Sequence, residues 1–327
     1  MVALCLISSA ERSGKTTIAA AIGRHLIGQG RRVGFFKPSL TAGPDPDAGL
    51  MREALGLDET LELLSPAYAD EKALKDNVKS AFARISAGKD VVIIEGPAGR
   101  SQLTDDIAEQ LDARAVAIEA YSRQLTGSVE STRKVGGRLI GVVLNKVPRS
   151  RLAQAKAELA QAGIKVLGVI PEDRALLTLT VAELARGTGG SIVQPKDGNT
   201  AALMENIMLG AMSPDHGPEY YSHKTNKAVV IRSDRPDMQL AALDTSTKCL
   251  VLAGKAAPIP MVLRRAEQRG VPVISADNDV AGVVVAIEAA LQDARLNKEK
   301  VARAAVLVAQ HLDFGVVYNG LGLSGQR

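Results

Sequence analysis

A phosphate-binding loop constrains this sequence more than any other feature. The segment Ser9–Thr17 (SAERSGKTT) directly follows the aliphatic run Val2–Ile7 and leads into the amphipathic stretch Thr16–Ile27. A strand, a loop ending in Gly-Lys-Ser/Thr and a helix, in this order, form the pattern of a P-loop. The backbone N–H groups of such a loop and the positive end of the helix attract phosphate. The sequence therefore predicts a nucleoside triphosphate site near residue 15.

The polar residues of this loop have distinct expected tasks. Lys15 is expected to bridge the β- and γ-phosphates, and the Thr16 hydroxyl is expected to ligate Mg²⁺. Ser9 departs from the pattern, because it stands where the first glycine is expected. The other residues expected to cradle the phosphates are Ser9, Ser13, Gly14 and Thr17.

Short aliphatic runs alternate with amphipathic stretches through the first two-thirds of the chain. This alternation predicts an α/β fold, a parallel sheet covered by helices with its ligand beyond the carboxyl ends of the strands. Aromatic residues make up only 3% of the chain, so aliphatic side chains must build its cores. The expected strands are Val2–Ile7, Arg32–Phe36, Val91–Ile94, Ala115–Ile118, Leu139–Leu144 and Val166–Ile170, and the expected helices are Thr16–Ile27, Glu71–Ala87, Ser122–Val135 and Arg151–Ala162.

A second, smaller α/β series follows the linker-like segment Ser213–Pro218. We therefore expect a P-loop domain at residues 1–212 and a second domain at residues 213–327. The strands expected in this domain are Ala228–Ile231, Cys249–Leu252 and Val271–Ile274, and the helices are Asp237–Leu243, Pro260–Arg269, Asp279–Gln292 and Lys298–His311.

Charged residues follow two of the expected strands close to the P-loop. Lys37 precedes Pro38, which favours an extended backbone, and its ammonium is expected to point towards the phosphate site. Glu95 ends the run Val91–Ile94, where a carboxylate associated with Mg²⁺ is expected. Asp47 is either a second acid of this kind or the N-cap of the following helix, and the residues alone do not decide between the two.

The residues after the fifth strand bear on the choice of base. Asn145 is followed by Lys146, Val147 and Pro148. A guanine-reading loop would have an aspartate at the position of Pro148, accepting from guanine. Because proline cannot accept in this way, the sequence favours adenine, read by the amide of Asn145, and hence ATP over GTP.

Composition excludes several other classes of function. The net charge of +4 is spread along the chain, and scarce aromatic residues argue against a nucleic-acid module. The two cysteines, Cys5 and Cys249, lie in aliphatic runs and are expected to be buried thiols. No run is long enough for a membrane span or a signal peptide, so we expect a cytoplasmic protein without membrane or nucleic-acid partners.

The first part of the chain resembles dethiobiotin synthetase. The resemblance covers roughly residues 1–190 and rests on Ser8–Thr16, Phe36–Pro38, Asp47–Ala48, Ile94–Gly96, Asn145–Val147 and Gly168–Pro171. It implies a homodimer whose nucleotide site includes Pro171. The implied roles are Lys15 and Lys37 on the phosphate and the reacting acyl oxygen, Thr16, Asp47 and Glu95 around Mg²⁺, and Asn145 on adenine.

The second part resembles the DRTGG domain. This resemblance rests on Asp234-Arg235, Leu250–Gly254 and Gly270–Ile274. The pairing of the two domains is similar to the N-terminal part of long phosphate acetyltransferases. Because the sequence ends at Arg327, we expect no acetyltransferase catalytic domain.

Several departures from these families bear on function. Glu11 places a carboxylate where dethiobiotin synthetase has a threonine near its substrate, and Pro97 stiffens the loop after Glu95. In the second domain, Pro236–Met238 replaces Thr-Gly-Gly, which leaves Arg235 as the candidate anion ligand. Retained ATP residues beside altered substrate residues favour a nucleotide-dependent regulatory or sensor protein with an unknown small-molecule effector. The alternatives are an ATP-dependent ligase-type enzyme, which activates a carboxylate or carbamate, and a scaffold with a vestigial P-loop.

Overall fold

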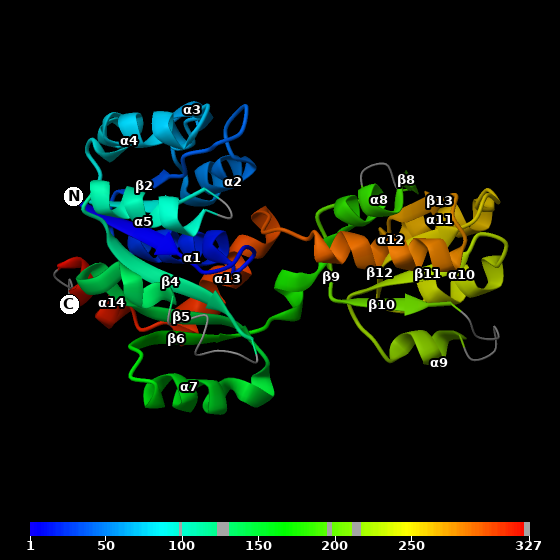
Figure 1. Cartoon of the computed structure of the whole chain (residues 1–327). Coiled ribbons are helices and arrows are strands. Elements are labelled where there is room, and N and C mark those ends of the chain that lie inside the picture. Colours follow the sequence, from blue (N-terminus) through cyan, green and yellow to red (C-terminus); the bar gives the residue numbers. More distant parts are fainter. Residues whose placement is uncertain (98–99, 123–130, 195–197, 211–216, 324–327) are drawn as a thin grey trace. The chain divides into compact units, whose positions relative to one another are not determined.

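The structure, a computed structural model, describes residues 1–97, 100–122, 131–194, 198–210 and 217–323. Its internal contacts divide the chain into two compact units (Figure 1). Unit 1 comprises residues 1–173 and 296–327, and unit 2 comprises residues 174–295. Within the described residues, no helix is both long enough and apolar enough to cross a membrane.

A six-stranded sheet forms the centre of unit 1, in the order β2-β3-β1-β4-β5-β6. Every neighbouring pair in it is parallel, as the strand-helix alternation predicts. Most strand residues are fully buried aliphatic side chains, because helices cover both faces. The strands are β1 (Val2–Ile7), β2 (Val33–Phe36), β3 (Val91–Glu95), β4 (Arg114–Ala120), β5 (Leu139–Val147) and β6 (Val166–Pro171).

The helices of unit 1 come from both of its segments of chain. The helix expected at Ser122–Val135 falls largely on residues 123–130, which lie outside the described residues. The helices are α1 (Lys15–Gly28), α2 (Pro46–Leu55), α3 (Leu61–Leu64), α4 (Glu71–Ser86), α5 (Ser101–Gln110), α7 (Leu152–Gln161), α13 (Lys298–His311) and α14 (Phe314–Leu321), and 3-10 turns cover Ser131–Arg138 and Arg149–Arg151.

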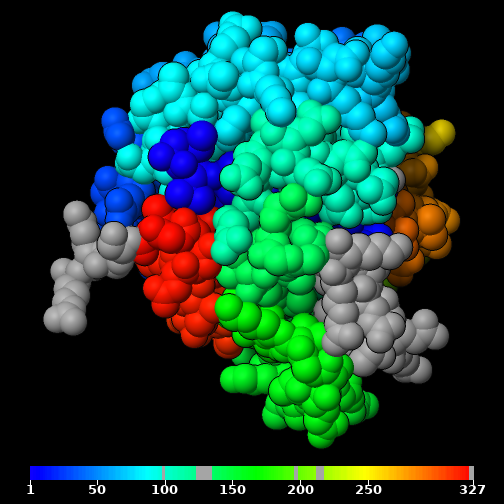
Figure 2. Space-filling model, turned by 60° about the vertical axis from the view of Figure 1, so that its left-hand side comes forward, coloured from blue at the N-terminus to red at the C-terminus, as the bar shows by residue number. Residues whose placement is uncertain are grey.

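The division into units differs from the boundary expected near residue 213. Unit 2 already begins at residue 174, and residues 296–327 belong to unit 1. The reason is the apolar stripe of α13, which buries Val301 and Ala304 and packs against α1, α2 and β6. Figure 2 shows the C-terminal residues directly beside N-terminal ones. The expected linker Ser213–Pro218 falls mostly on residues 211–216, outside the described part of the chain.

Unit 2 is a smaller α/β layer structure with a five-stranded sheet in the order β10-β11-β12-β13-β8. Strands β10 to β13 are parallel, and β8 is antiparallel at the edge. Apolar residues of α8 and α12 pack on one face of this sheet, and those of α10 and α11 pack on the other. Its elements are the 3-10 turn Arg174–Leu177, β7 (Leu179–Thr180), α8 (Val181–Thr188), β8 (Ser191–Gln194), β9 (Leu203–Met204), β10 (Asn206–Leu209), α9 (Gly217–Ser222), β11 (Lys227–Arg232), α10 (Pro236–Leu243), β12 (Thr247–Ala253), α11 (Pro260–Arg269), β13 (Val273–Ala276) and α12 (Val280–Gln292).

Candidate nucleotide-binding site

The predicted site residues of unit 1 gather at the carboxyl edge of its parallel sheet. The P-loop follows β1, Lys37 follows β2, and Glu95 ends β3. Asn145 lies near the end of β5, and the buried Pro171 ends β6. Because all six strands run in the same direction, residues far apart in the sequence reach one edge of the sheet, where α/β folds bind ligands.

The backbone of the P-loop requires glycine at position 14. Gly14 is the N-cap of α1 and has a φ of 97°, in the left-handed region that favours glycine. A Cβ atom at this position would lie 2.2 Å from Nδ2 of Asn145. The turn into α1 therefore depends both on the conformational freedom of Gly14 and on its missing side chain.

Lys15 lies in the first turn of α1, with its ammonium directed back along the loop. Its Nζ donates to the hydroxyl of Ser8 at 2.8 Å. Burial lowers the pKa of Lys15, and the positive charge of Lys37 adds to this effect. A phosphate anion would relieve both penalties, since an opposite charge favours the ammonium form. Glu11, the residue that departs from dethiobiotin synthetase, is exposed on the same loop.

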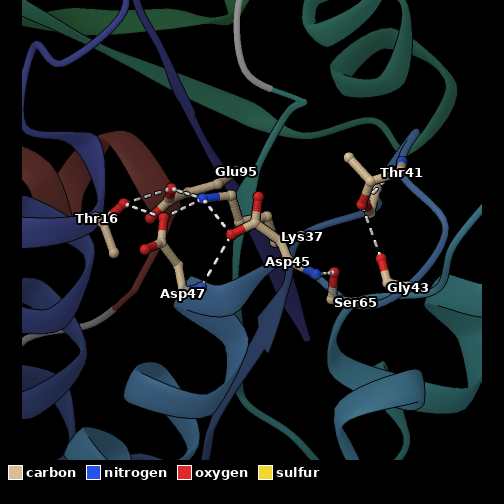
Figure 3. Close-up of polar contacts among 9 residues, drawn as sticks. Thr16, Lys37, Thr41, Gly43, Asp45, Asp47, Ser65 and Glu95 are labelled. Carbon is tan, nitrogen blue, oxygen red and sulfur yellow. Dashed lines mark hydrogen bonds and ion pairs between the residues drawn. The ribbon is translucent and has the colours of Figure 1, made fainter. Parts of the chain in front are cut away.

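Three carboxylates surround the ammonium of Lys37 (Figure 3). Its Nζ lies 3.3 Å from an oxygen of Asp45 and 3.4 Å from one of Glu95, and it also donates to Asp47. Burial lowers the pKa of Lys37, but the attraction of the three carboxylates outweighs burial and raises the pKa above its ordinary value. Lys37 therefore stays charged and holds the acids together.

The hydroxyl of Thr16 joins the same cluster. Its Oγ1 lies 3.1 Å from Asp47 and 3.0 Å from Glu95. The structure thus brings together Thr16, Asp47 and Glu95, the residues predicted to surround Mg²⁺. The N-cap role that the sequence left open for Asp47 belongs instead to Asp45, whose side chain accepts from the backbone N–H of Asp47 at 2.9 Å. The side chain of Asp47 is therefore directed to the cluster.

The chemistry of this cluster fits Mg²⁺. Glu95 is only 1% exposed, and its Oε1 has no hydrogen-bond partner within the described residues. Burial raises the pKa of Glu95, and Lys37 offsets part of that effect. The donors are carboxylate and hydroxyl oxygens, which hard cations prefer. Among the described residues, no three His, Cys, Asp or Glu side chains are placed to hold a metal by themselves, so phosphate oxygens would have to complete the coordination.

Glu119 is a site residue that the sequence analysis missed. It lies in β4, is 2% exposed, and accepts from the backbone N–H of Ser9 at 2.7 Å and from its hydroxyl at 2.6 Å. Burial raises the pKa of Glu119, against the lowering effect of the bonds from Ser9. A glycine at this position would keep the first of these bonds and lose the second, which needs the serine hydroxyl. The available signal was a carboxylate directly after the aliphatic run Ala115–Ile118.

The end of β5 is bonded to the P-loop. Nδ2 of Asn145 donates to the carbonyl of Ser13 at 2.9 Å, and its Oδ1 accepts from the backbone N–H of Lys146 at 2.9 Å. Nζ of Lys146 donates to the carbonyl of Arg12 at 2.7 Å. Asn145 thus contacts the phosphate-binding loop, and its role in reading adenine stays a prediction.

The other residues predicted for the site of unit 1 make fewer contacts there. Ser13 is fully buried, and its hydroxyl has no partner within the described residues. Thr17 lies half-buried in the first turn of α1. Pro97 follows β3 directly, but residues 98–99 of the same loop lie outside the described part of the chain.

In unit 2, the candidate anion ligand Arg235 pairs with a residue of the helix that it precedes, α10. Its Nη2 forms an ion pair with Asp237 at 2.8 Å, and both side chains are partly exposed. The residues that replace Thr-Gly-Gly therefore supply a carboxylate partner for the arginine.

Protein-family models match both parts of the chain. A model described as "AAA domain" matches residues 3–178, more than half of the chain, and one described as "DRTGG domain" matches residues 183–290. These matches confirm the two-part resemblance seen in the sequence, and the DRTGG match lies entirely within unit 2.

Known proteins also resemble the chain. It is 25% identical to a phosphate acetyltransferase of Pseudomonas aeruginosa, over 92% of this chain and 49% of that protein. It is 28% identical to the ATP-dependent dethiobiotin synthetase BioD of Methanococcus vannielii, over 40% of this chain and 73% of that protein. Among solved structures, the MinD cell division protein of Aquifex aeolicus aligns with a TM-score of 0.39 and 17% identity, over 54% of this chain and 85% of that one. The chain spans about half the length of the phosphate acetyltransferase that it matches.

Proposed function

Because the chain belongs to the family of AAA-domain P-loop proteins and carries a DRTGG domain, we propose that it is an Mg-ATP-binding regulatory or sensor protein with slow or no turnover. The observation that carries this proposal is the cluster of Thr16, Lys37, Asp47 and Glu95 beside the P-loop. A P-loop that no longer binds nucleotide would not require a buried lysine and two carboxylates in contact with its threonine.

Different residues of the chain would bind different parts of Mg-ATP. The N–H groups of the loop and Lys15 hold the phosphates, and the oxygens of Thr16, Asp47 and Glu95 hold the cation. Bound Mg²⁺ supplies positive charge to the β- and γ-phosphates. The ammonium of Lys37, which contacts the same carboxylates, would supply a further positive charge beside the phosphates.

The regulatory part of the proposal rests on connectivity and on altered residues. The DRTGG domain is inserted between two segments of the P-loop unit, so both of its ends are tethered to the nucleotide domain. The hydroxyl of Ser9 donates to Glu119, and Glu11 adds a carboxylate to the phosphate-binding loop. A negative charge in this place would repel an anionic acceptor substrate. We propose further that the protein responds to a small-molecule effector and forms a homodimer.

A second candidate function is an ATP-dependent ligase-type reaction. The similarity to a dethiobiotin synthetase favours it. In this reaction a carboxylate or carbamate oxygen attacks the γ-phosphorus, the bond from phosphorus to the β–γ bridging oxygen breaks, and ADP leaves. Lys15 and Lys37 would neutralise the charge that develops on the transferred phosphoryl group.

Turnover of ATP by the purified chain distinguishes the two functions. A regulatory protein should bind ATP and hydrolyse it more slowly than about 10⁻² per second, whatever small carboxylate is added, whereas enzymes commonly run at about 1 to 10³ per second. The Lys15→Ala variant is the control, because it should lose nucleotide binding. Turnover that rises into the enzyme range with one carboxylate would establish the ligase reaction and contradict the regulatory proposal.

A further inference from the structure

Unit 2 contains a cavity of about 600 Å³ at the carboxyl ends of two parallel strands, β11 and β12. The crevice outside the carboxyl ends of such strands is the usual ligand site of α/β sheets. The volume also falls within the range of small-molecule sites, roughly 300 to 1,000 Å³. The cavity is lined by the ends of these strands, the loops that follow them and the start of α12, including Arg232, Ser233, Asp234, Lys255, Asp279 and Ala281.

The floor of this cavity is fixed by bonds between neighbouring loops. The N–H of Ser233 donates to the carbonyl of Ala253 at 2.8 Å, and the hydroxyl of Ser233 accepts from the N–H of Ala256 at 3.2 Å. Gly254 has a φ of 111°, and a Cβ atom there would lie 2.8 Å from the Ser233 hydroxyl. The two loops thus lie in contact, so a ligand meets a preformed surface and loses less affinity to ordering.

Both carboxylates of the cavity are engaged within the chain. Asp234 accepts from Nε of Arg232 at 2.9 Å. Asp279 is the N-cap of α12 and accepts from the N–H of Gly282 at 2.8 Å. Lys255, in contrast, is exposed and forms no hydrogen bond or ion pair with the described residues. Of the charged side chains that line the cavity, Lys255 is therefore the one that no other described residue engages and that is left to pair with a ligand.

The first turn of α12 adds donors on the same side. Val280 and Ala281 are its first two residues and line the cavity. The N–H groups at these positions have no partner within a helix, and they carry the positive end of its dipole. We propose that this cavity binds a small phosphate-bearing anion, with Lys255 and the first turn of α12 on the phosphate and Arg232 at the rim.

Equilibrium dialysis of the full-length chain with inorganic pyrophosphate tests this proposal. We expect the chain to bind one pyrophosphate at this cavity in addition to any at the P-loop. Lys255→Ala should weaken the cavity site about tenfold or more, since a hydrogen bond to a charged group is worth roughly 1.5–3 kcal/mol. Lys248→Ala is the matched control, because Lys248 is an exposed lysine near the opposite end of the same strand, β12.

A second variant separates binding from folding. Ala281→Glu introduces a carboxylate into the first turn of α12, where an acid stabilises a helix. We expect this variant to lose the cavity site and to keep or raise its Tm. Lys15→Ala should remove only the P-loop site, so a failure of the proposed ATP site would leave the effect of Lys255→Ala intact.

Two results would overturn the inference. In the first, the wild-type chain binds no pyrophosphate beyond what Lys15→Ala removes. In the second, Lys248→Ala weakens binding as much as Lys255→Ala does, which would show only a general effect of surface charge.

Discussion

Glu119 accepts both the backbone N–H and the hydroxyl of Ser9, at 2.7 and 2.6 Å. The pair fixes the first residue of the P-loop to the end of a neighbouring strand, β4. It also places a buried carboxylate close enough to Lys15 to affect the lysine's charge. The loop is therefore bonded to Glu119 at Ser9 and to Asn145 at Ser13.

Glu119 should make stability depend on pH. Burial raises its pKa above the ordinary value of 4.5, so the folded state holds the proton more tightly than the unfolded state. Stability from this group is greatest below about pH 4.5 and declines as the pH rises through the folded pKa. Glu119→Gln keeps a polar partner for Ser9 without the charge. Its free energy of unfolding in urea, relative to wild type, should rise between about pH 4 and pH 7. A difference that does not change with pH would contradict the assignment.

Substitution of Lys37 should remove the positive charge that compensates the carboxylates of Asp45, Asp47 and Glu95. We expect Lys37→Met to lower the free energy of unfolding by about 3–5 kcal/mol, the cost of breaking a buried ion pair. A second substitution, Glu95→Gln, should restore part of this loss, because it removes the buried charge that was left unpaired. Urea unfolding of both single variants and the double variant gives the coupling between them. Strictly additive effects would show that the two residues do not interact.

Gly14→Ala should disrupt the P-loop. The left-handed backbone and the contact with Asn145 together predict a loss of about 1–3 kcal/mol of stability and of most nucleotide affinity. Gly28→Ala, in the same helix, is the control, since a Cβ atom there meets nothing within 4 Å. That change should be neutral or stabilise the protein by roughly 0.5–1 kcal/mol. Thermal unfolding and calorimetric titration with ATP measure both effects, and equal behaviour of the two variants would refute the prediction.

The base assignment is tested by comparing nucleotides. With Pro148 in place of a guanine-binding aspartate, ATP should bind more tightly than GTP. Pro148→Asp supplies the missing acceptor and should shift the preference towards GTP. Calorimetric titration of both proteins with both nucleotides measures the change, and tighter binding of GTP to the wild-type chain would contradict the role given to Asn145.

The sequence predicted the elements whose signals are local. The P-loop was visible because strand, loop and helix are adjacent in the chain. The aliphatic runs predicted the six strands of the first sheet and β11, β12 and β13 of the second, but not its parallel strand β10. The parallel order then implied that Lys37, Glu95 and Asn145 share one edge with the loop, as the structure has them. The apolar stripe of Lys298–His311 likewise predicted a helix with the bounds that α13 has.

Only the tertiary structure decided which partners these elements have. An apolar stripe defines a face but not the surface that it covers, so the sequence could not show that α13 packs on α1 and returns the chain to unit 1. The sequence left open whether Asp47 caps the following helix, and the structure gives that role to Asp45, which accepts from the backbone N–H of Asp47. The bond between Ser9 and Glu119 joins residues 110 positions apart. Local patterns specify backbone conformation and burial, whereas contacts over such separations depend on how the whole sheet is ordered, and that order is not written in any one segment.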